Sequence, residues 1–165
     1  MITLSIKEDG DTVSALLKKR FHRKAIRFCQ SSSSSDCDYI FLPKDALHSD
    51  ILVIHGPCSK QQGRGDYITL LNTDEKITAD IDKKSLLITY GLNPLATVTA
   101  SSMKEEAGKT VFSCCLQRSI VTLKGKIIEP QEFPVALKAP QAKLCDLLAF
   151  VSLGLVLSFT PDDFL

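Results

Sequence analysis

The sequence contains no tryptophan, and aromatic residues of any kind make up only 7% of its 165 residues. Proteins that bind single-stranded nucleic acid stack bases on aromatic side chains, so this scarcity argues against such a partner. An excess of charge of one sign is also missing, because the formal net charge is +1. A nearly neutral chain is not drawn as a whole to nucleic acid, anionic membranes or acidic substrates.

Long apolar runs are absent as well. The longest, from Leu144 to Phe159, is interrupted by Asp146 and is too short to cross a bilayer as a helix. The N-terminus lacks the basic region and following apolar stretch of a secretory signal. The sequence therefore predicts a cytoplasmic protein without a membrane partner.

Cysteine pairs with metal-ligand spacing are the third absence. None of the six cysteines forms a CxxC motif, and adjacent residues in a strand point to opposite faces. We therefore expect no metal site and interpret the cysteines as thiols that behave as small buried hydrophobes. They are Cys29, Cys37, Cys58, Cys114, Cys115 and Cys145.

What is present is a change of pattern along the chain. Short apolar segments at 2–6, 25–28, 38–42, 50–54, 67–71 and 85–90 predict strands, and helical spacing predicts a helix over 13–21. Continuous apolar strands suit a mostly parallel sheet flanked by helices. Short turns then separate strands at 97–100, 110–116, 119–123 and 133–137, which requires antiparallel pairing. We expect a single α/β domain over 1–165: an α/β part (1–95), a β-meander or hairpin extension (96–140) and a closing helix (141–160).

The segment SIKEDGDTVSALLKKRF, residues 5–21, has the layout of a phosphate-binding strand, loop and helix. Such loops direct backbone N–H groups at an anion and place a lysine on the outer phosphates. Here the order is Gly10, Asp11, Thr12, with an aspartate at the lysine position, and Glu8 and Asp9 add negative charge. We interpret this loop as a vestigial phosphate site in which the acids and Thr12 cap the helix, with Asp11 or Thr12 as the N-cap.

Two other groups of polar residues have a structural and a functional reading. The run KKRFHRKAIR, residues 18–27, is interpreted as a solvated face, with a nucleic-acid patch as the less favoured alternative. His55 precedes Gly56 at the end of a predicted strand, three residues before Cys58. We expect a loop histidine there, against the alternative of a Cys–His pair.

The closing helix carries a second functional hypothesis. It is apolar nearly all round, which is typical of a helix that is buried or that meets a partner. Both alternatives stay open, and the second predicts a homodimer or another protein partner. The candidate interface residues follow helical spacing: Leu147, Val151, Leu155 and Phe159.

Three segments carry a family resemblance: LNTDE at 71–75, LITYGLN at 87–93 and ATVTA at 96–100. They resemble the central, ATPase-type domain of the Mur ligases, ATP-dependent bacterial enzymes that add amino acids to peptidoglycan precursors. The resemblance implies a shortened central domain with a Rossmann-like sheet. It also implies that Asn72 corresponds to a family residue near the adenine, a cofactor-binding role that we weigh against a plain turn residue.

The departures from the family pattern decide the functional hypothesis. The Gly-Lys-Thr of the family is replaced by Gly10, Asp11 and Thr12, its Asp-His pair is missing, and its Gly-x-His-Asn motif is replaced by the sequence APQA at 139–142. We therefore expect no catalytic residue and no cofactor. The predicted function is a non-catalytic Mur-ligase-like domain that acts as a protein-interaction or regulatory module. The alternatives are a nucleotide-binding or ligase subunit completed in trans by a partner, and a small-metabolite-binding protein.

Overall fold

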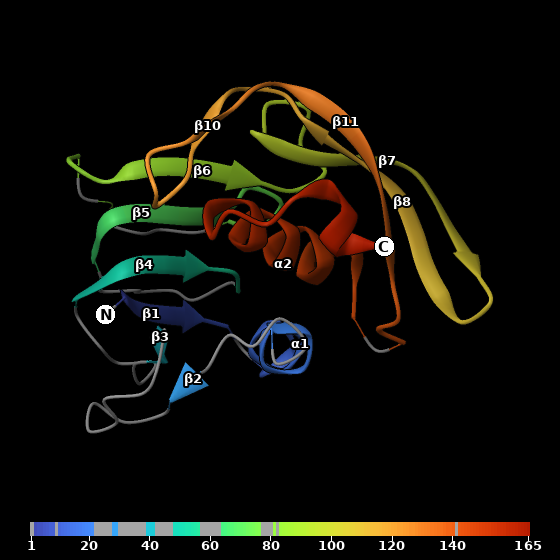
Figure 1. Ribbon diagram of the computed structural model, residues 1–165, viewed down its shortest axis with the longest axis horizontal. Helices are drawn as coiled ribbons and strands as arrows, with labels where there is room; N and C mark the ends of the chain where they lie inside the picture. The colour runs from blue at the N-terminus through green and yellow to red at the C-terminus, as the bar shows by residue number, and fades with distance from the viewer. Residues whose placement is uncertain are drawn as a thin grey trace. The chain divides into compact units, whose positions relative to one another are not determined.

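Parallel strands form the first part of the chain and antiparallel strands the second (Figure 1). The computed structural model describes residues 2–8, 10–21, 28–29, 39–41, 48–56, 64–76, 81, 83–140 and 142–165. It divides into two units, the first made of 1–71 and 75–87, the second of 72–74 and 88–165. Strand β6 (Leu86–Tyr90) crosses the division.

The first unit is a parallel sheet with the strand order β5-β4-β1-β3-β2. Its central strands are buried as the continuous apolar runs predict: Leu4 and the segment from Ile51 to Ile54 are at most 2% exposed. The strands are β1 (Ile2–Lys7), β2 (Phe28–Cys29), β3 (Tyr39–Phe41), β4 (His48–Ile54) and β5 (Arg64–Asn72).

Helix α1 (Thr12–Phe21) follows β1, and one face of the helix is buried. Val13, Leu17 and Phe21 are fully buried, at the spacing of one helical face. Lys18 and Lys19 lie exposed near the C-terminal end, where positive charge is favoured by the helix dipole. Residues 22–27, the rest of the basic run, lie outside the described residues.

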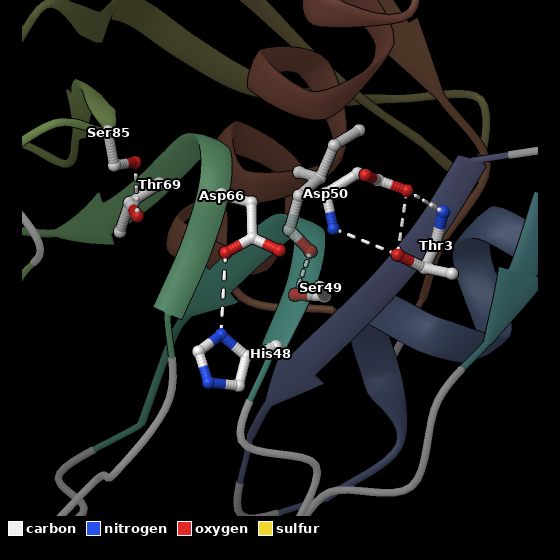
Figure 2. A network of polar contacts seen from close by, with 8 residues as sticks. Thr3, His48, Ser49, Asp50, Asp66, Thr69 and Ser85 are labelled. Carbon is white, nitrogen blue, oxygen red and sulfur yellow. Dashed lines mark hydrogen bonds and ion pairs between the residues drawn. The ribbon is translucent and has the colours of Figure 1, made fainter.

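At the beginning of the parallel strands β1 and β4, side chains form hydrogen bonds with the backbone (Figure 2). The register of β4 on β5 shifts between Ser49 and Ile51, and the Ser49 hydroxyl donates to the Ile51 carbonyl at 2.8 Å. Next to this bulge, Asp50 Oδ2 accepts from the Thr3 amide at 2.6 Å and from Thr3 Oγ1 at 2.7 Å. These contacts hold β1 to β4 at the end opposite to the loop that follows β1.

The second unit has the strand order β11-β8-β7-β6, in which β8 pairs antiparallel with both neighbours. A separate two-stranded hairpin joins β9 to β10. Helix α2 (Leu144–Val156) and the short 3₁₀ helix η2 (Pro161–Phe164) close the unit. The strands are β7 (Val98–Glu106), β8 (Lys109–Leu116), β9 (Ile120–Val121), β10 (Ile127–Ile128) and β11 (Gln131–Leu137).

The core of the second unit follows from the two-residue period of its strands. Phe112 and Cys114 on β8 stand directly opposite Val135 and Phe133 on β11, and all four are at most 4% exposed. Phe164 of η2 adds a ring that stacks on Phe133, with ring centroids 6.0 Å apart. The 3₁₀ helix is therefore part of the core.

The predicted α/β class, with a mostly parallel Rossmann-like sheet, an antiparallel extension and a closing helix, is confirmed by the fold. Strand β7 continues to Glu106, beyond the predicted end at residue 100. The prediction missed residues 101–106 because they are exposed and show no apolar alternation. Strand β10 was not predicted, for the same lack of periodicity over two residues. No helix among the described residues is long and apolar enough to cross a bilayer.

Candidate functional site

The free amide groups at the N-terminus of α1 are capped by a side chain, that of Glu8. Glu8, which follows β1, accepts a hydrogen bond from the Val13 amide at 2.9 Å and from the Ser14 amide at 3.1 Å. Its carboxylate also accepts from the Ser14 hydroxyl. Glu8 is only 5% exposed. The carboxylate thus occupies the place where a phosphate loop would bind its anion.

The residues interpreted as a vestigial phosphate loop, Gly10, Asp11 and Thr12, lead into the first turn of the same helix. The Asp11 carbonyl accepts from the Ala15 amide at 2.8 Å, so Asp11 takes the predicted N-cap position through its backbone. The predicted N-cap position of Asp11 is thus confirmed, and Glu8, one of the acids expected to cap the helix, supplies side-chain hydrogen bonds to its first turn. Gly10 is exposed, and a Cβ added there would meet its nearest atom at 3.8 Å, so the position does not require glycine. Asp9 lies outside the described residues.

Sequence reasoning missed that charged side chains at the end of β1 are buried. Lys7 is 7% and His55, at the end of β4, is 9% exposed, and the Lys7 carbonyl accepts from the His55 amide at 2.9 Å. A charged residue after an alternating strand normally indicates solvent, so no local signal marked these positions. Cys58, the expected alternative partner of His55, lies outside the described residues.

Two of the three segments that carry the family resemblance form one hydrogen-bonded double turn. Asp74 accepts from the Leu92 amide at 2.7 Å and from the Asn93 amide at 3.0 Å, one carboxylate oxygen for each. The Thr73 amide donates to the Tyr90 carbonyl at 2.9 Å. The LNTDE and LITYGLN segments are therefore joined by the side chain and backbone of their turn residues.

Gly91 is required by this arrangement. Its φ of +146° lies outside the usual range for residues with a side chain, and a Cβ there would meet the Asp74 carboxylate at 2.6 Å. The Asn93 side chain accepts from the Leu95 amide at 2.9 Å, and Arg118 donates to the Leu95 carbonyl at 3.0 Å. The turn is fixed on both sides and leaves Leu95 73% exposed.

Asn72 is buried within the same double turn, at 2% exposure. Its Oδ1 accepts from the Asp74 amide at 3.0 Å, which is the side-chain turn that Asn commonly forms. The structure thus gives Asn72 the role of a turn residue. Its nucleotide role remains a prediction from the resemblance.

The four candidate interface residues, three on α2 and Phe159 just after it, are not at the surface. Leu147, Val151 and Leu155 are fully buried, and Phe159 is 6% exposed. An all-apolar helix is either buried or in contact with a partner, and these four side chains are buried. A partner surface would have to involve other residues.

Cys114, Cys115 and Cys145 are free thiols, and of these three only Cys114 is buried, as expected for a small hydrophobe. Burial, with a smaller contribution from the neighbouring Cys115, raises the pKa of Cys114 to about 12. A thiol with that pKa is a poor nucleophile at neutral pH.

The fold of this chain is similar to that of several solved structures. No protein-family model and no curated protein matches the sequence. Crystal structure II of MurF from Acinetobacter baumannii matches with a TM-score of 0.60 and 10% identity, over 99% of this chain and 43% of that one. The structure of UDP-N-acetylmuramoyl-L-alanyl-D-glutamate–2,6-diaminopimelate ligase matches with a TM-score of 0.56, 9% identity, and 99% and 44% coverage. MurF ligase from Thermotoga maritima in complex with ADP matches with a TM-score of 0.50, 9% identity, and 99% and 47% coverage.

The chain is an α/β protein in which the Glu8 carboxylate caps the N-terminus of the helix that follows the first strand. Its fold is Mur-ligase-like, and it spans less than half the length of the ligases that it matches. At identities of 9% to 10%, this likeness defines the fold and not the activity.

Proposed function

We propose that this chain is a non-catalytic, cytoplasmic Mur-ligase-like domain that acts as a protein-interaction or regulatory module. The observation that supports it is the Glu8 carboxylate at the N-terminus of α1. A phosphate group could use the Val13 and Ser14 amides only after displacing a buried, hydrogen-bonded carboxylate. Charge-assisted hydrogen bonds of this kind are about twice as strong as neutral ones.

Electrostatics add to this exclusion. Two carboxylates, Glu8 and Asp11, lie beside the helix N-terminus, and the residue after Gly10 is Asp11 and not lysine. A triphosphate would therefore meet like charge where a nucleotide-binding loop supplies a cation. The helix dipole, which would favour the phosphate, is already neutralised by Glu8.

Thermal unfolding of the intact chain with and without millimolar Mg-ATP tests the proposal. A ligand that binds only the folded state stabilises it, by about 2.7 kcal/mol at a hundred times its Kd. We expect no saturable rise in Tm for the natural sequence. The double variant Glu8→Gln with Asp11→Lys removes the carboxylate and restores a cation, and serves as the sensitised comparison.

A saturable rise in Tm for the natural chain would overturn the proposal. It would favour the alternative of a nucleotide-binding or ligase subunit completed in trans, as the ADP complex of the Thermotoga maritima ligase suggests by analogy. Absence of binding directs the search to a protein partner or a second copy. Light scattering of the pure chain over a range of concentrations distinguishes self-association from the need for another protein.

A further inference from the structure

Strand β11 lies at the end of its sheet, and no strand among the described residues pairs with its outer edge. All seven residues of β11 pair with β8 in one continuous antiparallel register, without a bulge. A long, regular edge of this kind presents unpaired N–H and C=O groups and is a template for pairing with another chain. Such an edge pairs with a second copy unless a feature of the strand prevents it.

The hydrogen bonds of β7 show which backbone groups of β8 face β11. The Thr97 carbonyl accepts from the Gln117 amide at 2.8 Å, on the side of β8, whereas the Val98 carbonyl accepts from the Gly91 amide at 3.1 Å, on the other side. Facing directions alternate along an antiparallel ladder, and Thr99 is paired with Cys115. The backbone groups of Cys115 therefore face β7, and those of the residues on either side of it face β11.

The same alternation continues into β11. Phe133 is paired with Cys114, so the N–H and C=O groups of Phe133 face β8. The backbone groups of Glu132, Pro134 and Ala136 then face the free edge. Proline has no N–H and is found in strands where that group would face away from the neighbouring strand. Pro134 thus removes no hydrogen bond to β8, but it removes the middle donor of the free edge.

The other common protections of an edge are a bulge and charged side chains. Strand β7 has both, because its register on β8 shifts between Ser101 and Lys104 and an ion pair between Lys104 and Glu106 follows at 2.9 Å. The one charged residue of β11 is Glu132. Its Oε1 accepts from the Ser113 hydroxyl of β8 at 2.5 Å, so this carboxylate lies over the sheet. Pro134 is the feature of β11 that remains.

We propose that Pro134 prevents the free edge of β11 from pairing with a second copy of this chain. Two copies related by a two-fold axis would pair antiparallel, with Pro134 opposite Pro134 and Glu132 opposite Ala136, so like charges would not oppose the contact. Each copy lacks one donor, and both hydrogen bonds of the central pair are lost. The two Pro134 carbonyls are then enclosed without a partner, which is unfavourable. This inference does not depend on the proposed lack of nucleotide binding.

Amide hydrogen exchange of the intact, isotope-labelled chain, followed by NMR, tests the free edge in the natural sequence. We expect slow exchange for the amides of Phe133 and Val135, which are bonded to β8, and fast exchange for those of Glu132 and Ala136. Protection of Glu132 and Ala136 equal to that of their neighbours would show that the edge is already paired, and would overturn the proposal.

Pro134→Thr restores the central donor with a residue that favours strands. Two regained hydrogen bonds should tighten self-association by roughly tenfold to a hundredfold relative to the natural chain, measured by analytical ultracentrifugation over a range of concentrations. Pro134→Ala also restores the donor and should strengthen association in the same way, but less. Ala136→Thr is the matched control, because Ala136 faces the same edge and already has its N–H. This control should associate as the natural chain does.

The amide at position 134 of Pro134→Thr should become protected from exchange only at concentrations at which dimers form. Two results would overturn the proposal. One is that folded Pro134→Thr and Pro134→Ala both associate no more strongly than the natural chain. The other is that Ala136→Thr associates as strongly as Pro134→Thr, which would assign the effect to the side chain and not to the amide. The amide spectrum of each variant shows whether it is folded.

Discussion

At the scale of single residues, the fold decides chemistry by enclosing some groups and leaving their neighbours exposed. Cys114 and Cys115 are adjacent, yet Cys114 is fully buried on the core face of β8 and Cys115 is only half-buried on the other. The two-residue period of a strand produces this difference. Two thiols that look alike in the sequence therefore behave differently.

The raised pKa of Cys114 predicts a loss of stability in alkali. The pKa rises from an ordinary value of 9.0 to about 12 in the folded chain, so the folded state holds the proton more tightly than the unfolded state does. The stabilisation is complete below pH 9.0 and is lost as pH rises toward about 12. Denaturant unfolding should show a larger loss between neutral pH and about pH 10.5 for the natural chain than for Cys114→Ala. Equal losses would show that Cys114 does not titrate in this way.

At the scale of elements, the C-terminal turn of α2 locks η2 onto the core. The Phe159 amide donates to the Gly154 carbonyl at 2.8 Å and the Ser158 amide to the Leu155 carbonyl at 2.9 Å, the two bonds of a Schellman motif. Phe164 packs edge-on against Phe150, with ring centroids 6.0 Å apart. Gly154 allows this packing, because a Cβ there would lie 2.8 Å from the Phe164 ring.

Gly154→Ala tests this packing in the direction opposite to helix propensity. Alanine favours a helix over glycine by about 1 kcal/mol, but forcing a methyl group against a packed ring typically costs about 1–3 kcal/mol. We expect a net loss in the free energy of unfolding, measured by urea denaturation. Ser152→Ala is the matched control, because Ser152 is fully buried in the same helix and its Oγ has no partner among the described residues. That control should be neutral or stabilising, and a stabilised Gly154→Ala would contradict the packing argument.

At the scale of the whole molecule, charge balance governs behaviour in solution. The sequence pI is about 7.6, so net repulsion between molecules is smallest near that pH. Light scattering should show the strongest concentration-dependent association near pH 7.6 and less at about one and a half pH units on either side. Association that is independent of pH and saturates at a defined mass would instead indicate a specific second-copy interface.

Much of the fold could be predicted because its signals are local. The apolar period of β8 and the helical spacing of Val13, Leu17 and Phe21 depend only on neighbouring residues. The exposed end of β7 and the two residues of β10 were missed because solvated strands carry no such period. The predicted strand at 25–28 is described only at Phe28, which lies in β2, and the residues before it lie outside the described part.

The candidate site divides in the same way. That Gly10 is followed by Asp11 and not by lysine is evident from the sequence alone, and so are the segments that resemble the Mur ligases. Only the tertiary structure decided three other features. The Glu8 carboxylate accepts from the Val13 and Ser14 amides, and Asp74 accepts from the amides of Leu92 and Asn93. Lys126 lines a cavity at the end of α2. The physical reason is distance along the chain. Periodicity is a property of neighbours, whereas a hydrogen-bond partner or a cavity wall exists only once the path of the backbone has brought distant residues together.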